Sequence, residues 1–234
     1  MEAIVLAGGF GTRLRELVPD IPKPMAPVAG KPFLEILLQQ LSDKGFRRVV
    51  LSVGFMSETI IGHFGSRFAK LELDYVVETA PLGTGGAMRY ALEKAAGDHV
   101  FVMNGDTYLD LEVDKVEALW RANGAPIIVG REVPDTARYG RLLAQDGRVC
   151  GFAEKGAGGA GLINAGCYVF KRGQLDSFPL LTPFSLETDY LARSVTKEHF
   201  DLFVTKGDFI DIGVPEDYYR AQMHFCKIVR GVLD

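Results

Sequence analysis

The segment Gly8-Gly9-Phe10-Gly11-Thr12-Arg13 combines a run of glycines with a permanently charged arginine. Glycine allows backbone amides to face an anion and phosphate oxygens to approach closely, and the planar guanidinium of Arg13 matches those oxygens. The loop follows the apolar run from Ala3 to Ala7, and such a strand end is where an α/β sheet binds ligands. We therefore predict a polyphosphate-binding loop made of Leu6, Ala7, Gly8, Gly9, Gly11, Thr12 and Arg13.

Two better-known glycine loops do not match this segment. A P-loop requires GxxxxGK[ST], and a dinucleotide fingerprint requires GxGxxG, where this chain has Leu14 at the third glycine position. A second cation, Lys23, lies between Pro22 and Pro24. Because prolines restrict the neighbouring backbone, Lys23 is better placed for a fixed phosphate contact than an ordinary surface lysine. Arg13 and Lys23 are the predicted catalytic cations.

Two aspartates follow apolar runs that read as strands. Asp106 comes after His99 to Met103, and Asp211 comes after a second run late in the chain. Mg²⁺ prefers carboxylate and phosphate oxygens and usually takes only one or two protein carboxylates. The sequence predicts that Asp106 and Asp211 bind Mg²⁺. A zinc site is not indicated, because the histidines show no HxxxH or HxH spacing and no CxxC occurs.

Glu78 ends the run from Leu73 to Val77, just before a glycine-rich helix start. A carboxylate only accepts hydrogen bonds, so it complements the N1 and N2 donors of guanine or the N3 donor of uracil, and it disfavours adenine. The residue type does not separate GTP from UTP. In Glu154-Lys155 the carboxylate suits a sugar hydroxyl and the ammonium suits a phosphate, and the amide of Asn164 suits a hydroxyl.

The overall composition excludes several classes of protein. With 47% hydrophobic and 24% charged residues among 234, the chain has the balance of a globular protein and not of a disordered one. Its formal net charge of −4 lacks the basic excess of a nucleic-acid binder. Without a basic apolar leader or an apolar run of about 18 residues, we expect no membrane segment and a cytoplasmic location.

The remaining pattern alternates apolar strands with helical periods. Near-continuous apolar runs between helices predict an α/β fold: a Rossmann-like mixed, mostly parallel sheet with helices on both faces. Residues 140–154 and 163–170 lack a long helix between them and predict antiparallel additions to that sheet. Pro215 marks the start of a final helix. No linker divides residues 1–234, so we predict one domain, with residues 1–110 mainly binding nucleotide and 111–234 mainly binding sugar phosphate.

The string from Gly8 to Pro24 resembles the GGxGTRL...PKP signature of the sugar 1-phosphate nucleotidylyltransferases, or nucleoside-diphosphate-sugar pyrophosphorylases. Further similar motifs follow in order along nearly the whole chain. They are residues 78–87, Asn104-Gly105-Asp106, Tyr139-Gly140, Glu154-Lys155, Asn164-Ala165-Gly166 and residues 209–215. The resemblance implies transfer of a nucleotidyl group from a nucleoside triphosphate to a sugar 1-phosphate, with Mg²⁺ and release of pyrophosphate.

The same resemblance assigns roles to individual positions. It implies nucleotide contacts at Glu78, Pro81, Gly83 and Thr84 and sugar-phosphate contacts at Asn104, Gly140, Glu154, Lys155, Asn164 and Glu187. Residues 22–35 and 81–87 look most like guanylyltransferases that use D-glycero-D-manno-heptose 1-phosphate, which implies GTP as substrate and a place in capsule or lipopolysaccharide biosynthesis. Mannose 1-phosphate guanylyltransferase and N-acetylmuramate 1-phosphate uridylyltransferase are the alternatives, and a homodimer is left open.

Two other classes of protein compete with this interpretation. A glycosyltransferase of similar fold would also use an aspartate-held metal, but it has no need of the triphosphate loop from Gly8 to Arg13. A non-catalytic module that senses nucleotide sugars would tolerate loss of a catalytic residue. The presence of Arg13, Lys23, Asp106 and Asp211 favours an enzyme.

Overall fold

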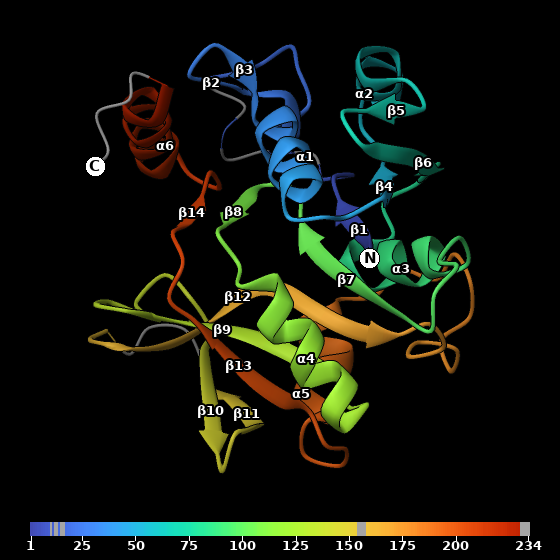
Figure 1. Ribbon diagram of the computed structural model, residues 1–234, viewed down its shortest axis with the longest axis vertical. Coiled ribbons are helices and arrows are strands. Elements are labelled where there is room, and N and C mark those ends of the chain that lie inside the picture. Colours follow the sequence, from blue (N-terminus) through green and yellow to red (C-terminus); the bar gives the residue numbers. More distant parts are fainter. Residues whose placement is uncertain (10, 12–13, 15–16, 154–157, 230–234) are drawn as a thin grey trace.

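The structure is a computed structural model that describes residues 1–9, 11, 14, 17–153 and 158–229. Among these residues, ten strands form one sheet in the order β10-β11-β13-β9-β12-β7-β1-β4-β6-β5 (Figure 1). Their bounds are β1 Glu2–Leu6, β4 Arg48–Val53, β5 Arg67–Phe68, β6 Leu71–Val77, β7 His99–Asn104, β9 Ile127–Val133, β10 Arg141–Gln145, β11 Arg148–Ala153, β12 Gly161–Lys171 and β13 Asp201–Thr205. Two small antiparallel sheets pair β2 (Pro27–Val28) with β3 (Lys31–Pro32), and β8 (Thr107–Leu109) with β14 (Phe209–Asp211).

The sheet is mixed, as the sequence predicts. Strands β7, β1, β4 and β6 are parallel neighbours, with Ala3 opposite both Val49 and Phe101. Strand β12 runs antiparallel to β7 and to β9, and β10 pairs antiparallel with β11. The predicted antiparallel additions after residue 130 are therefore confirmed. Parallel pairing returns only between β13 and β9 among the described strands of that half.

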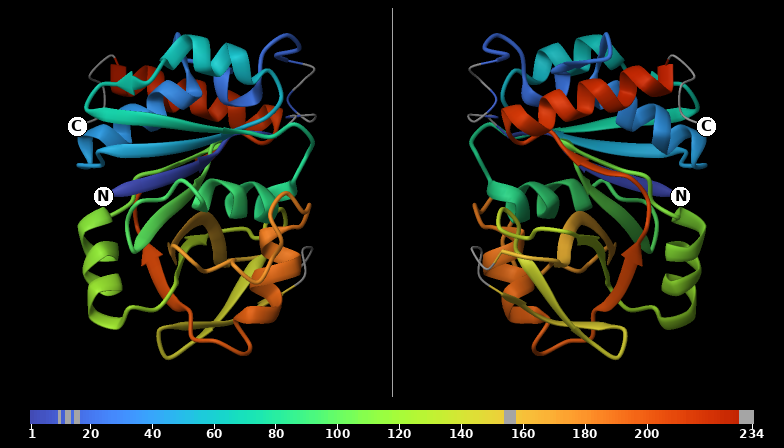
Figure 2. Two further views of the ribbon diagram at one scale, coloured as in Figure 1. Left: turned by 90° about the vertical axis from the view of Figure 1, so that its right-hand side faces the viewer. Right: turned by 90° about the vertical axis from the view of Figure 1, so that its left-hand side faces the viewer.

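Helices cover both faces of the sheet (Figure 2). Their bounds are α1 Phe33–Asp43, α2 Ser57–Phe64, α3 Gly83–Leu92, α4 Val113–Asn123, α5 Ala192–Ser194 and α6 Pro215–Val229, with a 3-10 turn η1 at Lys23–Met25 and a π-helix η2 at Leu186–Leu191. Side chains alternate along β1, so Ala3 and Val5 pack with α1, α4 and α6 while Ile4 packs with α3 and η2. Two apolar cores result, one on each face.

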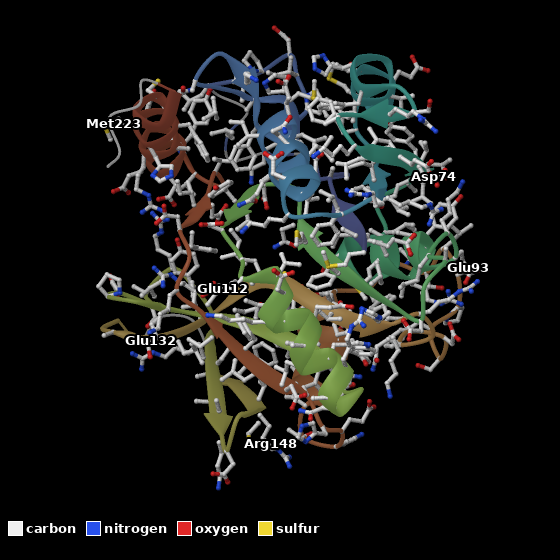
Figure 3. All side chains as sticks on the ribbon, in the orientation of Figure 1. Asp74, Glu93, Glu112, Glu132, Arg148 and Met223 are labelled. Carbon is white, nitrogen blue, oxygen red and sulfur yellow. The ribbon has the colours of Figure 1, made fainter. Side chains whose placement is uncertain are left out.

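The antiparallel pairing of β8 with β14 brings the two predicted metal aspartates together. Asp211 pairs with Thr107, and the backbone carbonyl of Asp106 accepts a hydrogen bond from the amide of Ile212 at 2.9 Å. Glu112, labelled in Figure 3, holds the chain that leads to β14, because its carboxylate accepts from the Thr205 hydroxyl at 2.5 Å. Tertiary pairing thus joins positions that are about a hundred residues apart.

No helix among the described residues is long and apolar enough to cross a membrane. Cys150, Cys167 and Cys226 are free thiols. The expectation that the cysteines build neither a disulfide framework nor a thiolate metal site is consistent with their wide separation along the chain.

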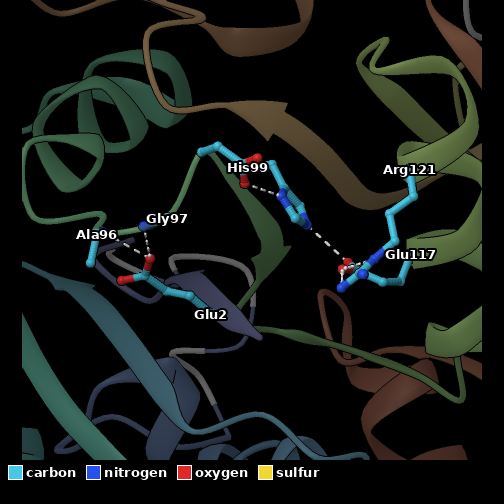
Figure 4. Close-up of polar contacts among 7 residues, drawn as sticks. Glu2, Ala96, Gly97, His99, Glu117 and Arg121 are labelled. Carbon is cyan, nitrogen blue, oxygen red and sulfur yellow. Dashed lines mark hydrogen bonds and ion pairs between the residues drawn. The ribbon is translucent and has the colours of Figure 1, made fainter.

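A polar cluster at the start of β7 allows a test of pH-dependent stability (Figure 4). Glu117 of α4 contacts the His99 ring nitrogen at 2.8 Å and accepts from Arg121 at 2.9 Å. Partial burial raises the pKa of Glu117, but hydrogen bonds from His99 and Arg121 outweigh burial, and the net pKa lies below the ordinary value of 4.5. A carboxylate with a lowered folded-state pKa stabilises the fold above its unfolded pKa and loses that contribution as the pH falls.

We expect Glu117→Gln to lower the free energy of unfolding by on the order of 1 kcal/mol at pH 7, because it removes charge-assisted hydrogen bonds. The difference from the unsubstituted chain should shrink as the pH falls from 4.5 towards the lower pKa of the folded state, because the carboxylate of the unfolded chain takes up a proton first and the native one only at lower pH. Urea unfolding at pH 7, 5 and 4 measures this change. If the difference in the free energy of unfolding stayed constant over this pH range, the charge of Glu117 would not contribute to stability.

Candidate active site

A pocket of about 300 Å³ opens at the carboxyl ends of β1 and β7. Most of the predicted site residues that the structure describes line it together. The lining is Leu6, Ala7, Gly8, Gly9, Lys23, Pro24, Glu78, Pro81, Gly83, Thr84, Ala87, Asn104, Gly105 and Asp106. Parallel strands end at the same edge of a sheet, which explains why segments distant in sequence converge here. A glycine-rich loop, a lysine and carboxylates around one cavity form a place suited to phosphate groups.

Lys23 projects into the pocket from the first residue of η1. Its side chain is 9% exposed, and its ammonium lies 2.5 Å from Oδ2 of Asp106. The turn is held by two backbone hydrogen bonds, from Met25 to Pro22 at 2.7 Å and from Ala26 to Lys23 at 3.0 Å. Gly11, with φ of 59°, lies so close that a Cβ atom there would be 2.6 Å from Cβ of Lys23. The glycine-rich loop and the lysine segment therefore pack directly against each other.

Asp106 and Asp211 form an adjacent pair of carboxylates. Oδ1 of Asp106 accepts from the Thr107 hydroxyl at 3.3 Å, and Oδ1 of Asp211 accepts from the Gly213 amide at 2.6 Å. Burial and the neighbouring charge of Asp106 raise the pKa of Asp211, while Lys23 and the Gly213 amide oppose this rise. The raised pKa reflects concentrated negative charge, which a divalent cation would relieve.

Two carboxylates are a suitable protein contribution to a magnesium site, because Mg²⁺ completes its shell with water and phosphate oxygens. Within the described part of the chain, no group of three or more histidine, cysteine, aspartate or glutamate side chains could hold a metal. The carboxylate oxygens of Asp106 and Asp211 therefore suit a cation that also binds phosphate oxygens of a ligand. They suit less well a cation whose ligands all come from the protein.

Glu78 lies between this pocket and a second one of about 170 Å³, which is lined also by Gly54, Phe55, Thr79 and Ala80. Its two oxygens accept from the Ser52 hydroxyl at 3.2 Å and from the Leu82 amide at 3.1 Å. Burial raises the pKa of Glu78, although both hydrogen bonds act in the opposite direction. A Cβ atom on Gly8 would come within 2.3 Å of Oε1 of Glu78, so only glycine fits there without movement of that carboxylate.

Hydrogen bonds connect the glycine-rich start of α3 to η2, and a second set lies on β12. The Thr84 hydroxyl donates to Oε2 of Glu187 at 2.9 Å and accepts from the Leu186 amide at 2.9 Å. Tyr168, fully buried, accepts from Nδ2 of Asn164 at 2.8 Å. Burial raises the pKa of Tyr168 well above its ordinary value, so the phenol stays protonated and remains a donor.

Glu187 sits in the π-helix η2, and such turns often occur at functional sites. On β12, Oδ1 of Asn164 accepts from the Gly166 amide at 3.1 Å. A Cβ atom on Gly166 would lie 2.4 Å from Nδ2 of Asn104, which belongs to the pocket lining. Thr84 at the pocket wall thus contacts Glu187, and Asn164 approaches the pocket through Gly166 and Asn104.

The structure places the other predicted residues less directly. Gly140, which is half-buried, is not in the pocket lining, and neither are Gly11, Asn164, Glu187 and Asp211. Thr12, Arg13, Glu154 and Lys155 lie outside the described residues. The sequence interpretation missed Ser52, Gly54 and Tyr168. Ser52 lies near the end of β4 and Gly54 directly follows it, and β4 is the parallel neighbour of β1, so their position at a strand end was a signal that could have found them.

Comparison with known proteins gives relatives that span nearly the whole chain. The D-glycero-alpha-D-manno-heptose 1-phosphate guanylyltransferases of Aneurinibacillus thermoaerophilus and Campylobacter jejuni are each 38% identical, over 95% and 94% of this chain and 97% and 98% of their own lengths. The mannose-1-phosphate guanylyltransferase of Mycobacterium tuberculosis is 33% identical over 99% of this chain, which matches 66% of that protein.

A solved structure shows the same fold. HddC from Yersinia pseudotuberculosis, complexed with GMP-PN, superposes with a TM-score of 0.86 at 39% identity and covers 96% of this chain and 99% of its own. A family model described as nucleotidyl transferase matches residues 2–228. The superposition, the sequence identity and this match agree, and the chain belongs to the nucleotidyl transferase family.

Proposed function

We propose that the chain transfers a guanylyl group from GTP to D-glycero-α-D-manno-heptose 1-phosphate, producing the GDP-sugar and pyrophosphate. The observation that carries this proposal is one pocket in which the glycine-rich loop, Lys23 and Asp106 meet beside Glu78. The heptose 1-phosphate guanylyltransferases at 38% identity support the acceptor, and the GMP-PN complex of HddC supports the guanine nucleotide. Such a product would serve capsule or lipopolysaccharide biosynthesis.

In this reaction an oxygen of the sugar phosphate attacks the α-phosphorus of GTP, and the bond from that phosphorus to the bridging oxygen of pyrophosphate breaks. Both reactants are anions, so catalysis depends on positioning and on neutralising charge. The amides of Gly8 and Gly9 would hold phosphate oxygens, and Lys23 would contact the transferring phosphoryl group. We assign the departing pyrophosphate to Arg13. Residues 1–110 would mainly bind the nucleotide and residues 111–234 the acceptor.

Mg²⁺, when bound by Asp106 and Asp211, would supply further positive charge to the phosphates. Glu78 would accept hydrogen bonds from N1 and N2 of guanine in the smaller pocket, where Gly8 leaves room for the Glu78 carboxylate. On the acceptor side, Asn104, Gly140, Glu154, Lys155, Asn164 and Glu187 are the proposed contacts of the sugar phosphate. A homodimer stays a prediction.

A pyrophosphate-release assay tests the proposal. It combines GTP, UTP, dTTP, CTP and ATP with heptose, mannose, glucose and N-acetylmuramate 1-phosphates in the presence of Mg²⁺. Release confined to GTP and heptose 1-phosphate supports the full assignment, and release with another pair corrects the substrates. Mannose 1-phosphate is the second candidate acceptor because of the 33% identical mycobacterial relative. No release from folded protein would favour a glycosyltransferase or a sensing module.

The Tyr168 hydroxyl provides a test of the acceptor side. Tyr168→Phe removes one buried hydroxyl that accepts from Nδ2 of Asn164 at 2.8 Å, and the ring keeps its packing. We expect KM for the sugar 1-phosphate to rise about 10-fold and KM for GTP to change by less than about 2-fold, because the amide of Asn164, a proposed sugar-phosphate contact, loses its hydrogen-bond partner. Tyr190→Phe is the matched control, since the hydroxyl of this buried tyrosine faces Gln174 at 2.6 Å. Equal effects of the two variants would refute the role of Tyr168.

A further inference from the structure

The connection between β9 and β10 carries Tyr139-Gly140 and is firmly attached on one side. Its Thr136 amide donates to the carbonyl of Gly159 at 3.0 Å, and Oδ1 of Asp135 accepts from the Gly159 amide at 3.2 Å. The Arg141 guanidinium adds a hydrogen bond to the carbonyl of Ala160 at 2.7 Å. These contacts join the connection to the start of β12, within the half of the molecule that we assign to the acceptor.

On its other side the same connection reaches helix α6 through Arg138. The guanidinium of Arg138 forms an ion pair with the buried carboxylate of Asp217 and a second with Glu216 at 3.4 Å. It also lies 5.7 Å from the centre of the Tyr139 ring, and that ring meets Phe209 of β14 edge-on at 5.9 Å. A single side chain thus links the Tyr139-Gly140 motif to the helix that follows Asp211.

Helix α6 itself is attached to the nucleotide half. The Tyr218 hydroxyl donates to the carbonyl of Pro27 at 2.6 Å, and Oε1 of Gln222 accepts from the Ala29 amide at 2.8 Å. Pro27 lies two residues after η1, which carries Lys23. The ion pair of Arg138 and Asp217 therefore connects the Tyr139-Gly140 motif to helix α6, and α6 in turn contacts the segment that follows Lys23.

The connection matters because the two substrates must be held at a precise distance from each other. The sugar phosphate must approach the α-phosphorus to near contact, and a displacement of about 1 Å can cost about 100-fold in rate. Asp217 is buried and paired, so its charge favours a fixed geometry, and the planar fork of arginine restricts that geometry more than an ammonium would. Arg220 also contacts Asp217, at 3.2 Å, but it belongs to α6 and crosses no boundary.

We propose that Arg138 is a positioning residue whose ion pair with Asp217 fixes the Tyr139-Gly140 motif relative to the catalytic carboxylates, and so sets the affinity for the sugar 1-phosphate. This inference rests on the proposed function. In this role the ion pair of Arg138 and Asp217 contacts neither substrate and acts by holding the Tyr139-Gly140 motif in place.

The test compares Arg138→Gln, Arg138→Lys, Asp217→Asn and the double variant R138Q/D217N in the pyrophosphate-release assay. We expect Arg138→Gln to raise KM for the sugar 1-phosphate about 10-fold and to leave KM for GTP within about 2-fold of the unsubstituted value. Arg138→Lys should give an intermediate KM, because it keeps the charge and loses the planar fork. The double variant should be no worse than the more impaired single variant, since both remove one interaction.

Arg220→Gln is the matched control, because it removes the other cation on Asp217 within α6 and should leave both KM values unchanged. Thermal unfolding checks that each variant is folded, and the Arg138 variants decide the matter if Asp217→Asn does not fold. Suppose that the unsubstituted enzyme is active. An unchanged KM for the sugar 1-phosphate in Arg138→Gln, or additive effects on KM in the double variant, would then overturn this inference and leave the proposed function intact. Inactivity of the unsubstituted chain with every substrate pair would overturn the proposed function and this inference together.

Discussion

Replacing Asp106 with asparagine is expected to lower kcat at least about 10³-fold while the protein stays folded. Asparagine keeps the size of the side chain, so the loss reports the missing charge that contacts Lys23 at 2.5 Å and that we propose to hold Mg²⁺. The Asp106 side chain is 35% exposed, which limits any effect on stability. Initial rates of pyrophosphate release over a Mg²⁺ titration measure the effect, and thermal unfolding reports on the fold.

Asp110 is the control for this experiment. It lies four residues after Asp106, and its carboxylate contacts the Lys44 ammonium at 2.7 Å, beside a different cavity lined by α1 and Phe225. Asp110→Asn should keep a near-normal rate because this carboxylate is not part of the pocket lining. A near-normal rate for Asp106→Asn at saturating Mg²⁺ would remove Asp106 from the metal site.

The substitution Lys23→Met is expected to reduce kcat/KM for GTP by about 10² to 10³-fold, because it removes a buried cation from the phosphate site. Methionine fills a similar volume, and Asp106 can be solvated when the ammonium is absent. Lys23→Arg should restore little activity, because the larger head group has to fit beside Gly11, which already touches the lysine stem. The measurement is kcat/KM for GTP at fixed acceptor and Mg²⁺.

Lys31→Met serves as the control for Lys23. Lys31 is 60% exposed on the side chain and pairs with Glu35 at 3.0 Å, so its charge is solvated and remote from the pocket lining. We expect it to retain kcat/KM within about 2-fold. If both lysine variants were equally active, Lys23 would have no role in phosphate binding or transfer.

Much of the fold was predictable from local pattern. The apolar run from Ala3 to Ala7 and the final helix beginning at Pro215 appear as β1 and α6, because burial on both faces of a parallel strand and a proline at a first helical position leave clear traces in sequence. The π-helix at Leu186–Leu191 left no such trace, since it is held by the bonds that Thr84 makes with Glu187 and with the Leu186 amide.

Residue types and their order by themselves determined the phosphate loop, the isolated lysine between prolines, and the two strand-end aspartates as candidates for nucleotidyl transfer. These candidates can be recognised from residue type alone, because a glycine, a cation or a carboxylate can bind the same chemical groups wherever it lies in the fold. Only the tertiary structure decided that Asp106 and Asp211 adjoin and that Lys23 lies against Gly11 and Asp106. It also decided that Arg138 joins the Tyr139-Gly140 motif to helix α6. These contacts cross long stretches of sequence and arise from strand pairing and core packing, which no short motif records.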